Sequence, residues 1–337
     1  MQIREDWLAQ VREEIVDPER PIVDPHHHFF LGSEMFPDYM LGDLWKDTGS
    51  GHHVEQTVFL QCGMHYRESG PESMAPVGET EWVAGIAAEA AKGRKGAARI
   101  GAIAGHADLC LGAAVREVLE AHLQASPLFC GIRDIAIWDA DPEVHSVPKA
   151  SDAALYRDPK FREGFAQLEP LGLSFDAYHY HTQTPYLTEL ARAFPGTTIV
   201  LDHLGTPVGV ASYAGKREEI FAQWKRDLTE LATCPNVVIK LGGMLMPWNG
   251  YGWELRERPA TSDELVQVQG RYYRHAIEAF GPERCMFESN FPVDKIAISY
   301  AVLWNAFKKL VKDLSTSEQD AMLRGTATRV YRLKPVG

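Results

Sequence analysis

Eight short apolar segments, rich in β-branched residues, recur along the 337-residue chain, and helical patterns separate most of them. We expect strands at 21–29, 55–61, 98–104, 129–135, 173–180, 198–203, 236–241 and 284–289. Strands that alternate with helices indicate βαβ units and a parallel sheet. Eight such units predict an α/β fold whose sheet closes on itself, the (β/α)8 TIM barrel.

Helices are expected between these strands at 81–95, 109–124, 186–194, 217–233, 262–280 and 298–312. In the fourth of these segments, Ile220, Trp224 and Leu228 recur at the spacing of one helix face. A final helix is predicted from Ser315, because Glu318 follows three residues later and completes a Ser-x-x-Glu capping box.

No linker, repeat or low-complexity segment divides the chain, so residues 1–337 are expected to form one barrel domain. Single barrels of this class routinely exceed about 250 residues. Two long segments, 30–53 and 244–261, follow the first and seventh strands and are expected to be loops. In a barrel, both lie on the C-terminal face, where active-site lids and substrate walls occur. Packed insertions without a role in binding are the equally weighted alternative.

Composition disfavours several classes of function. The formal net charge is -12 and no basic run offsets it, which argues against nucleic acid and acidic membrane surfaces as partners. The N-terminus lacks the apolar core of a secretory signal, and no run of about 18 apolar residues could span a membrane. The five cysteines are scattered without a Cys-x-x-Cys pair, which argues against disulfides and a thiolate zinc site. A cytoplasmic location fits best.

Three consecutive histidines lie at the end of the first expected strand. Alternate side chains of a strand share a face, so His26 and His28 point together and His27 points the opposite way, toward the helix layer. Two imidazoles that face the lumen can bind one divalent metal or one polar substrate. A histidine cluster satisfied by hydrogen bonds in the core is the alternative. The position of the pair at the end of the first of eight strands favours a site.

Other strand ends also carry histidines. His179 and His181 end the fifth strand and share one face, while Tyr178 and Tyr180 share the other. Alternation alone does not decide which pair faces the lumen. His203 ends the sixth strand, and a glycine two residues later frees the backbone for a sharp exit, so we expect this histidine in the site.

The eighth strand ends with a carboxylate and an amide on one face. Glu288 and Asn290 are two residues apart and point together, whereas Ser289 lies on the other face. A carboxylate at this point can activate water as a general base. An amide cannot take up a proton, although it can ligate or orient.

These motifs together resemble the amidohydrolase superfamily, in particular its second large family of TIM-barrel hydrolases. That family includes 2-pyrone-4,6-dicarboxylate lactonase and hydrolases of fucono- and rhamnonolactones. The resemblance covers nearly the whole chain and rests on Asp24-x-His26-x-His28, Gly131-Ile-Arg133, Leu201-Asp-His203-x-Gly205-x-Pro207, Lys240-Leu-Gly-Gly243 and Phe287-Glu-Ser-Asn-Phe-Pro292. It implies an enzyme that acts on a small molecule.

The resemblance also implies roles for single residues. His26 and His28 match histidines that bind metal in many members, whereas the lactonase branch can work without metal and use them to bind substrate. His203 matches the residue that polarises the carbonyl or helps to ligate. Arg133 matches an arginine placed to grip a carboxylate or lactone oxygen, which its planar fork suits. Lys240 ends the seventh strand, where a substrate contact and an ion pair are equally consistent.

One position departs from the family pattern. The eighth-strand motif of the family usually reads Gly-Ser-Asp-Trp-Pro, with the aspartate as general base or metal ligand, and Asn290 stands at the aligned position. Glu288 on the same face and Asp294 just past the strand are the candidates to replace that base. A histidine base and a loss of hydrolysis are the remaining alternatives.

The leading hypothesis is hydrolysis of a sugar or dicarboxylate lactone, in which water attacks the ring carbonyl. One divalent ion, zinc or manganese, is expected, and metal-free operation stays open. The expected site comprises His26, His28 and His181 as metal ligands, His203, Glu288, Asn290 and Asp294 as catalytic residues, and Arg133, Tyr178, His179 and Lys240 as substrate-binding residues.

Two other functions are compatible with the same residues. Non-oxidative decarboxylation of an aromatic acid occurs in the same broad family, although it usually requires the eighth-strand aspartate that Asn290 replaces. A barrel that binds a small ligand without catalysis is the second alternative. The aromatic residues Trp248, Tyr251 and Trp253 can wall a pocket or form a contact in a homo-oligomer, and the sequence does not choose between them.

Overall fold

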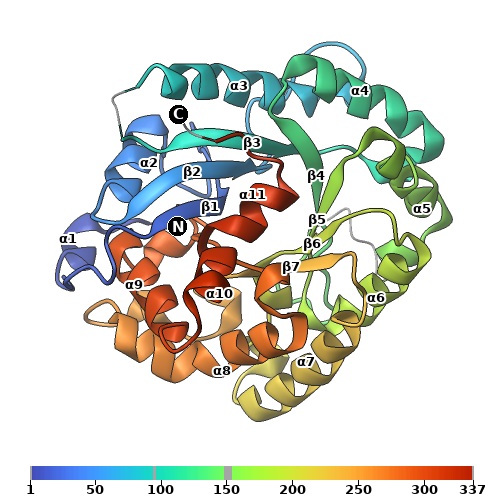
Figure 1. Cartoon of the computed structure of the whole chain (residues 1–337). Coiled ribbons are helices and arrows are strands. Elements are labelled where there is room, and N and C mark those ends of the chain that lie inside the picture. Colours follow the sequence, from blue (N-terminus) through green and yellow to red (C-terminus); the bar gives the residue numbers. More distant parts are fainter. Residues whose placement is uncertain (1, 94–95, 148–153, 336–337) are drawn as a thin grey trace.

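Eight parallel strands form one sheet in the order β1 to β8, and each strand pairs with the next along the chain (Figure 1). The computed structural model describes residues 2–93, 96–147 and 154–335. Hydrogen bonds from Asn290 N to the His26 carbonyl (3.1 Å) and from His28 N to the Phe291 carbonyl (2.8 Å) join the end of β8 to β1. The expected (β/α)8 barrel is therefore confirmed. The strands are β1 (Pro21–His27), β2 (His53–Leu60), β3 (Arg99–Gly105), β4 (Phe129–Ile135), β5 (Ser174–Tyr178), β6 (Ile199–Leu201), β7 (Val237–Leu241) and β8 (Cys285–Phe287).

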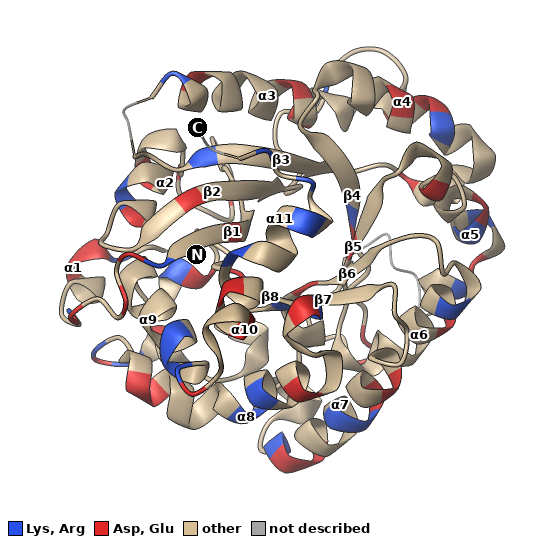
Figure 2. Ribbon diagram, viewed as in Figure 1, with Lys and Arg blue, Asp and Glu red and all other residues tan. Residues whose placement is uncertain are grey.

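Helices form a layer outside the strands, and the charged residues of both signs that they carry lie around the periphery (Figure 2). On α7, Trp224 and Leu228 are buried, and the Trp224 indole donates to the Leu204 carbonyl beyond β6 (2.6 Å). A bilayer-spanning helix does not occur among the described residues. The α-helices of the described ranges are α1 (Glu5–Leu8), α2 (Leu41–Thr48), α3 (Val77–Ala91), α4 (Val115–Ala125), α5 (Pro159–Phe165), α6 (Thr184–Ala193), α7 (Arg217–Leu231), α8 (Ser262–Phe280), α9 (Tyr300–Leu310), α10 (Thr316–Asp320) and α11 (Thr326–Val330).

The segment 30–53 contains helix α2, so the expectation of a continuous loop is wrong there. Leu41 and Leu44 are buried on its inner face. The helix has only about two turns, so the apolar spacing repeats too few times to be recognised among the surrounding glycine and aspartate residues. Helix α3 begins four residues before the expected 81, and residues 94–95 of that expected helix lie outside the described ranges. By contrast, 244–261 follows β7 and contains only short 3-10 turns.

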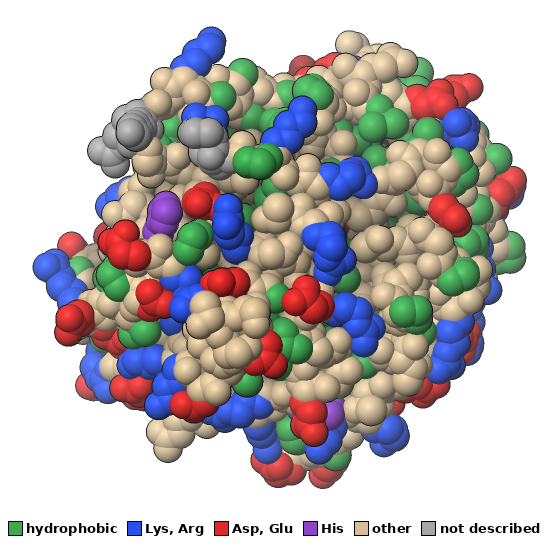
Figure 3. Space-filling view, viewed as in Figure 1, with side chains coloured by type: hydrophobic (Ala, Val, Ile, Leu, Met, Phe, Trp, Pro, Cys, Tyr) green, Lys and Arg blue, Asp and Glu red, His purple; other side chains and the backbone are tan. Residues whose placement is uncertain are grey.

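The C-terminal segment closes the N-terminal end of the barrel. Helix α11 lies across the strands in Figure 1, and its Ala327 and Val330 share an apolar cluster with Val23 of β1 and Val58 of β2. The space-filling view of this face shows charged side chains of both signs scattered over it (Figure 3). A ligand therefore reaches the lumen from the opposite end, where the strands finish.

The side chain of His27 points away from the lumen, as strand alternation predicts. Its ring is fully buried, 4.9 Å from the Phe29 ring and 5.9 Å from the Phe59 ring between centroids. Burial lowers the pKa of His27 to about 3, because the apolar surroundings disfavour the charged imidazolium.

We expect replacement of this histidine to make the protein less sensitive to acid. The unfolded state binds a proton at His27 below pH ~6.5, whereas the folded state does so only near its depressed pKa of about 3, so this residue makes the free energy of unfolding fall as pH drops. Relative to wild type, His27→Leu should gain about 2 kcal/mol more stability at pH 5 than at pH 7.5. Urea unfolding at both pH values measures this, with the exposed His53→Leu as control. Equal shifts at both pH values would contradict the assignment.

Candidate active site

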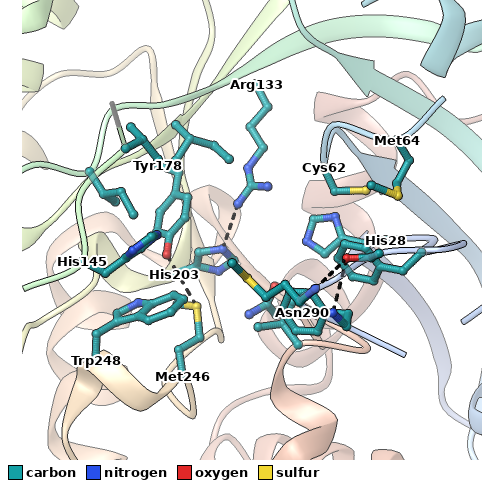
Figure 4. Close-up of a pocket in the computed structure, with 18 residues that line it drawn as sticks. His28, Cys62, Met64, Arg133, His145, Tyr178, His203, Met246, Trp248 and Asn290 are labelled. Atoms are coloured by element: carbon teal, nitrogen blue, oxygen red, sulfur yellow. Dashed lines mark hydrogen bonds between the residues drawn. The ribbon is translucent and has the colours of Figure 1, made fainter. Parts of the chain in front are cut away.

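A cavity of about 310 Å³ opens at the C-terminal ends of the strands (Figure 4). Its lining comes from the loops that follow β1, β2, β4, β7 and β8 and from the ends of β5 and β6. The polar part of this lining consists of His28, Ser33, Cys62, Arg133, His145, His203 and Asn290. The cavity therefore lies on the face where the sequence places the functional histidines.

The first-strand pair forms the start of the site. The Nε2 atoms of His26 and His28 lie 3.1 Å apart, and both rings are buried. Nδ1 of His28 is 2.8 Å from the Leu60 carbonyl, which only accepts, so this nitrogen carries the proton. Nδ1 of His26 accepts a hydrogen bond from Lys240 Nζ (3.1 Å) and lies 2.7 Å from Oε2 of Glu288. Nε2 of His26 therefore carries the proton and donates to Nε2 of His28 (3.1 Å).

This arrangement is chemically suited to a cation. Burial lowers the pKa of His26 and of His28 well below the ordinary histidine value, so both rings are neutral and each has one ring nitrogen with a lone pair. Metal-ligating histidines commonly donate their other N–H to a carboxylate or a carbonyl. His28 donates to the Leu60 carbonyl, and in the tautomer that would bind an ion through Nε2, His26 would donate to the Glu288 carboxylate 2.7 Å away. The pair thus fits one divalent ion or a polar group of a substrate.

A second histidine is held by the same carboxylate. Glu288 Oε1 accepts from Nδ1 of His203 (2.7 Å) and from its backbone N–H (3.2 Å), while Oε2 faces Nδ1 of His26. Glu288 is fully buried behind the two rings and does not line the cavity. This position does not support the expectation that Glu288 contacts the attacking water; its contacts suit a residue that positions the histidines.

A buried charge network lies behind the histidines. Asp202 binds Lys240 Nζ (3.0 Å) and Arg133 Nε (3.0 Å), and Lys240 also binds Asp176 (2.8 Å) and approaches His26 Nδ1 (3.1 Å). Burial opposes ionisation of Asp202, but the two cations outweigh it and hold the pKa of Asp202 at about 2. Lys240 does not line the cavity. Of the two roles left open for this lysine, the structure has the ion pair.

One set of potential metal ligands is present within the described ranges. Atoms of His26, Asp202 and His203 lie within 4.8 Å of one another. Asp202 already contacts two cations through its two oxygens, one at Lys240 and one at Arg133. The ring nitrogens of His26, His28 and His203 remain as the better donors.

Two glycines after β7, Gly242 and Gly243, allow the backbone there to approach Glu288 and His203 closely. A Cβ on Gly243 would lie 2.1 Å from Nδ1 of His203, and one on Gly242 would lie 2.3 Å from the Glu288 carbonyl oxygen. Opposite them, His203 and Leu204 both have φ of 54°, a left-handed conformation that is rare for residues other than glycine. Such strain often marks functional positions.

The fifth strand brings its tyrosine to the cavity and sends its histidines elsewhere. Tyr178 lines the cavity, with the Arg133 guanidinium 4.9 Å from its ring centroid. His179 points outward, where its ring nitrogens meet the hydroxyls of Tyr156 and Thr184 (both 3.3 Å). Neither His179 nor His181 lines the cavity.

The placement of His181 has a simple cause. β5 ends at Tyr178, and a 3-10 turn begins at His181, so the period-two alternation no longer applies there. Nδ1 of His181 instead faces Val208 N at 3.4 Å. The expectations of a metal ligand at His181 and a substrate contact at His179 are therefore not supported by the structure.

The structure shows the surroundings of Asn290, which stands where the family pattern usually has an aspartate. Asn290 lines the cavity in the left-handed conformation (φ 55°), and its Nδ2 donates to Asp294 Oδ1 (3.0 Å). Asp294 is buried and does not line the cavity. Burial raises the pKa of Asp294 well above its usual range, which favours the neutral acid. Asp294 is thus poorly placed to act as the base, and it orients the Asn290 amide instead.

Sequence reasoning missed most of the apolar lining. Ile137 and Val147 follow β4, Phe36 and Met64 follow β1 and β2, and Met246 follows β7. Loop residues have no periodicity that would indicate where they point. Of the three aromatic residues that the sequence offered as pocket walls, Trp248 lines the cavity, whereas Tyr251 and Trp253 do not.

Comparisons with known proteins give one family. The family model described as Amidohydrolase matches residues 23–333. An uncharacterized protein, y4mH of Sinorhizobium fredii, is 32% identical over 327 residues, which cover 93% of this chain and 98% of that protein. An L-fucono-1,5-lactonase of Burkholderia ambifaria is 26% identical over 337 aligned residues, covering 94% of this chain and 97% of the lactonase.

A solved structure has the same fold over nearly the full length. It is an amidohydrolase from Burkholderia multivorans with bound zinc, 24% identical, with a TM-score of 0.72, and the match covers 93% of this chain and 99% of that one. The barrel fold, the histidines at the strand ends and a family match over nearly the whole chain all point to the same family. This chain belongs to the amidohydrolase family.

Proposed function

We propose that this protein hydrolyses lactones in the cavity bounded by His28, Arg133 and His203. The observation that carries the proposal is the position of Glu288, which accepts Nδ1–H from His203 (2.7 Å). This leaves Nε2 of His203 as an acceptor beside the cavity, where Arg133 Nη2 donates to it (3.3 Å). The L-fucono-1,5-lactonase activity named for the Burkholderia ambifaria relative supports the choice of a cyclic ester.

In the proposed reaction, water adds to the ring carbonyl and the ring C–O bond breaks. His203 takes a proton from the attacking water, and the Glu288 carboxylate stabilises the resulting imidazolium. His203 then returns this proton to the departing ring oxygen, so the product is a hydroxy acid. Arg133 Nη2, 3.3 Å from Nε2 of His203, lies next to the reacting atoms and can donate to the developing oxyanion.

His26 and His28 are the residues that we propose to hold one divalent ion, zinc or manganese. Their Nε2 atoms converge at 3.1 Å, Nδ1 of His28 donates to the Leu60 carbonyl, and Nδ1 of His26 lies 2.7 Å from the Glu288 carboxylate. When bound, such an ion supplies Lewis-acid polarisation of the carbonyl and lowers the pKa of water. If the protein works without metal, the same two nitrogens form hydrogen bonds with the substrate or with water.

The proposal predicts proton release from a lactone panel. Untagged protein, first stripped with a chelator and then supplied with zinc or manganese, should hydrolyse at least one γ- or δ-lactone, which pH-stat titration detects. A rate that returns only with added ion would support the metal site at His26 and His28. No turnover of any lactone under either condition would contradict the proposed function.

The same panel separates the two alternatives. Aryl carboxylates tested beside the lactones report decarboxylation through released carbon dioxide. Carbon dioxide release without lactone hydrolysis would replace the proposal by a decarboxylase. If neither reaction occurs while cavity-sized ligands raise the melting temperature, the barrel is a binding protein.

A further inference from the structure

We propose that the preferred substrate is a neutral lactone with an apolar body, an alkyl or aryl substituent on the ring, and that polyhydroxylated and dicarboxylate lactones are poor substrates. This inference rests on the proposed function and narrows it to a substrate class. It comes from the walls of the cavity, which differ in character from the reacting centre (Figure 4).

One wall is formed by the loops after β4 and β7. Ile137, Val147, Met246 and Trp248 line the cavity there, next to Tyr178 of β5. The Tyr178 hydroxyl is directed at the sulfur of Met246 (3.6 Å), so the one polar atom of this tyrosine already has a partner. This wall therefore presents mostly hydrocarbon, sulfur and aromatic surface to a ligand, with the His145 ring 5.8 Å from the Trp248 ring as its polar member.

The opposite wall comes from the loops after β1, β2 and β8. Phe30, Phe36, Met64 and Val293 line it, and the rings of Phe30 and Phe36 stack with centroids 4.4 Å apart. The nearby Ser33 hydroxyl accepts hydrogen bonds from two backbone amides of its own loop, at 3.2 and 3.3 Å. It is thus already engaged in the local turn.

Most polar side chains of the cavity lie at the reacting centre. His28, Arg133, His203 and Asn290 are the groups that the proposed reaction and its metal site would occupy. A sugar-derived lactone carries several hydroxyls that lose water on binding, and each buried hydroxyl without a partner weakens binding. The walls add the His145 imidazole and the Trp248 indole N–H, which is fewer than the partners that such hydroxyls need.

Charge argues against a dicarboxylate in the same way. Arg133 is the one Lys or Arg among the lining residues that the structure describes, and Asp202 already pairs with its Nε atom. Burying two further carboxylates would require cations that this lining does not offer. A neutral substrate meets no such penalty.

The cavity has room for such a substituent. Its volume of about 310 Å³ lies at the lower end of the range that holds small organic ligands. Each methylene moved from water onto an apolar wall improves binding by roughly 4-fold. A chain of four carbons beyond the ring should therefore raise kcat/KM by about 10²-fold if it is fully buried.

The test compares substituents on one ring size. The kcat/KM values for δ-hexanolactone, δ-octanolactone and δ-decanolactone should rise along the series. The last should exceed L-fucono-1,5-lactone and 2-pyrone-4,6-dicarboxylate by at least about 10²-fold. A preference for either polar lactone would overturn the inference and leave lactone hydrolysis intact.

The Met246→Gln variant tests whether the apolar walls cause the preference for longer alkyl substituents. Met246→Gln replaces sulfur and methyl by an amide of similar size, and its loss of kcat/KM should grow with chain length, reaching about 10-fold for δ-decanolactone. Met74→Gln, outside the cavity lining, is the matched control and should not alter the series. A Met246→Gln loss that is independent of chain length would contradict the proposed position of the substituent.

A binding measurement keeps the two proposals distinguishable. Calorimetric titration with δ-lactams that carry the same substituents does not depend on ester hydrolysis. Tighter binding of the alkyl lactam than of a polyhydroxylated lactam supports the apolar substrate class even if no lactone turns over, in which case the proposed function alone fails. Tighter binding of the polyhydroxylated lactam overturns the inference.

Discussion

The Glu288→Gln variant is expected to hydrolyse lactones about 10²–10⁴-fold more slowly in kcat than the wild-type protein. The carboxylate accepts Nδ1–H from His203 at 2.7 Å, and its other oxygen lies 2.7 Å from Nδ1 of His26. A glutamine can keep the hydrogen bond to His203 but carries no negative charge. It therefore stabilises the imidazolium that forms at His203 less well than the carboxylate does.

The control for this experiment is Glu117→Gln, the same substitution at an exposed position of α4. It should leave kcat unchanged. Because Glu288 acts by positioning, the loss should fall mainly on kcat, with a smaller change in KM. Wild-type kcat in Glu288→Gln, measured by pH-stat under metal-saturating conditions, would contradict the role assigned to this carboxylate.

The Lys240→Met variant is expected to lower the free energy of unfolding by about 3–5 kcal/mol. Lys240 is fully buried, and its Nζ lies 2.8 Å from Asp176 and 3.0 Å from Asp202. The neighbouring carboxylates outweigh burial and raise the pKa of Lys240, so the lysine remains charged. Methionine fills a similar volume but leaves two buried carboxylates with one cation, Arg133, which contacts only Asp202.

Urea unfolding of Lys240→Met at pH 7 measures this effect. Lys46→Met is the matched control, because Lys46 is largely exposed and its ion pair with Glu5 spans 3.4 Å, a contact worth at most about 1 kcal/mol. Adding Asp176→Asn to Lys240→Met should recover part of the lost stability, since it removes one uncompensated charge. A loss below about 1 kcal/mol in the single variant would show that the network does not need the lysine.

The strand pattern of this fold is readable from sequence, but the ends of the shorter strands are not. β4 runs from Phe129 to Ile135, as expected. The sixth strand was expected over 198–203 and ends instead at Leu201. There the backbone enters the left-handed conformation at His203 and Leu204, which the sequence indicates only through the nearby Gly205. Local strain of this kind depends on the packing around it.

Period-two alternation located the first-strand pair correctly and failed at the fifth strand. His26 lies in β1, and His28 directly follows the strand, where its N–H still bonds to the Phe291 carbonyl (2.8 Å), so the pair keeps the shared face that alternation predicts. His179 and His181 lie beyond the last residue of β5, where no strand face exists. The sequence contained no marker of that early end.

The function of Glu288 required the three-dimensional structure. Alternation put it on the same face as Asn290, which suggested a base in contact with water. Its two oxygens are instead directed at imidazoles from β1 and from the end of β6, far away in the sequence. Long-range pairing of side chains is set by barrel geometry, and a single sequence does not reveal it.

We propose that His203, held by Glu288, accepts the proton from the water that opens a lactone ring. The most direct test is a pH-stat comparison of wild type and His203→Gln on an alkyl δ-lactone, with both proteins saturated with metal and shown to melt cooperatively. We expect turnover by the wild-type protein and a loss in kcat of at least about 10²-fold in His203→Gln. Equal rates for the two proteins, or no lactone hydrolysis by either, would contradict it.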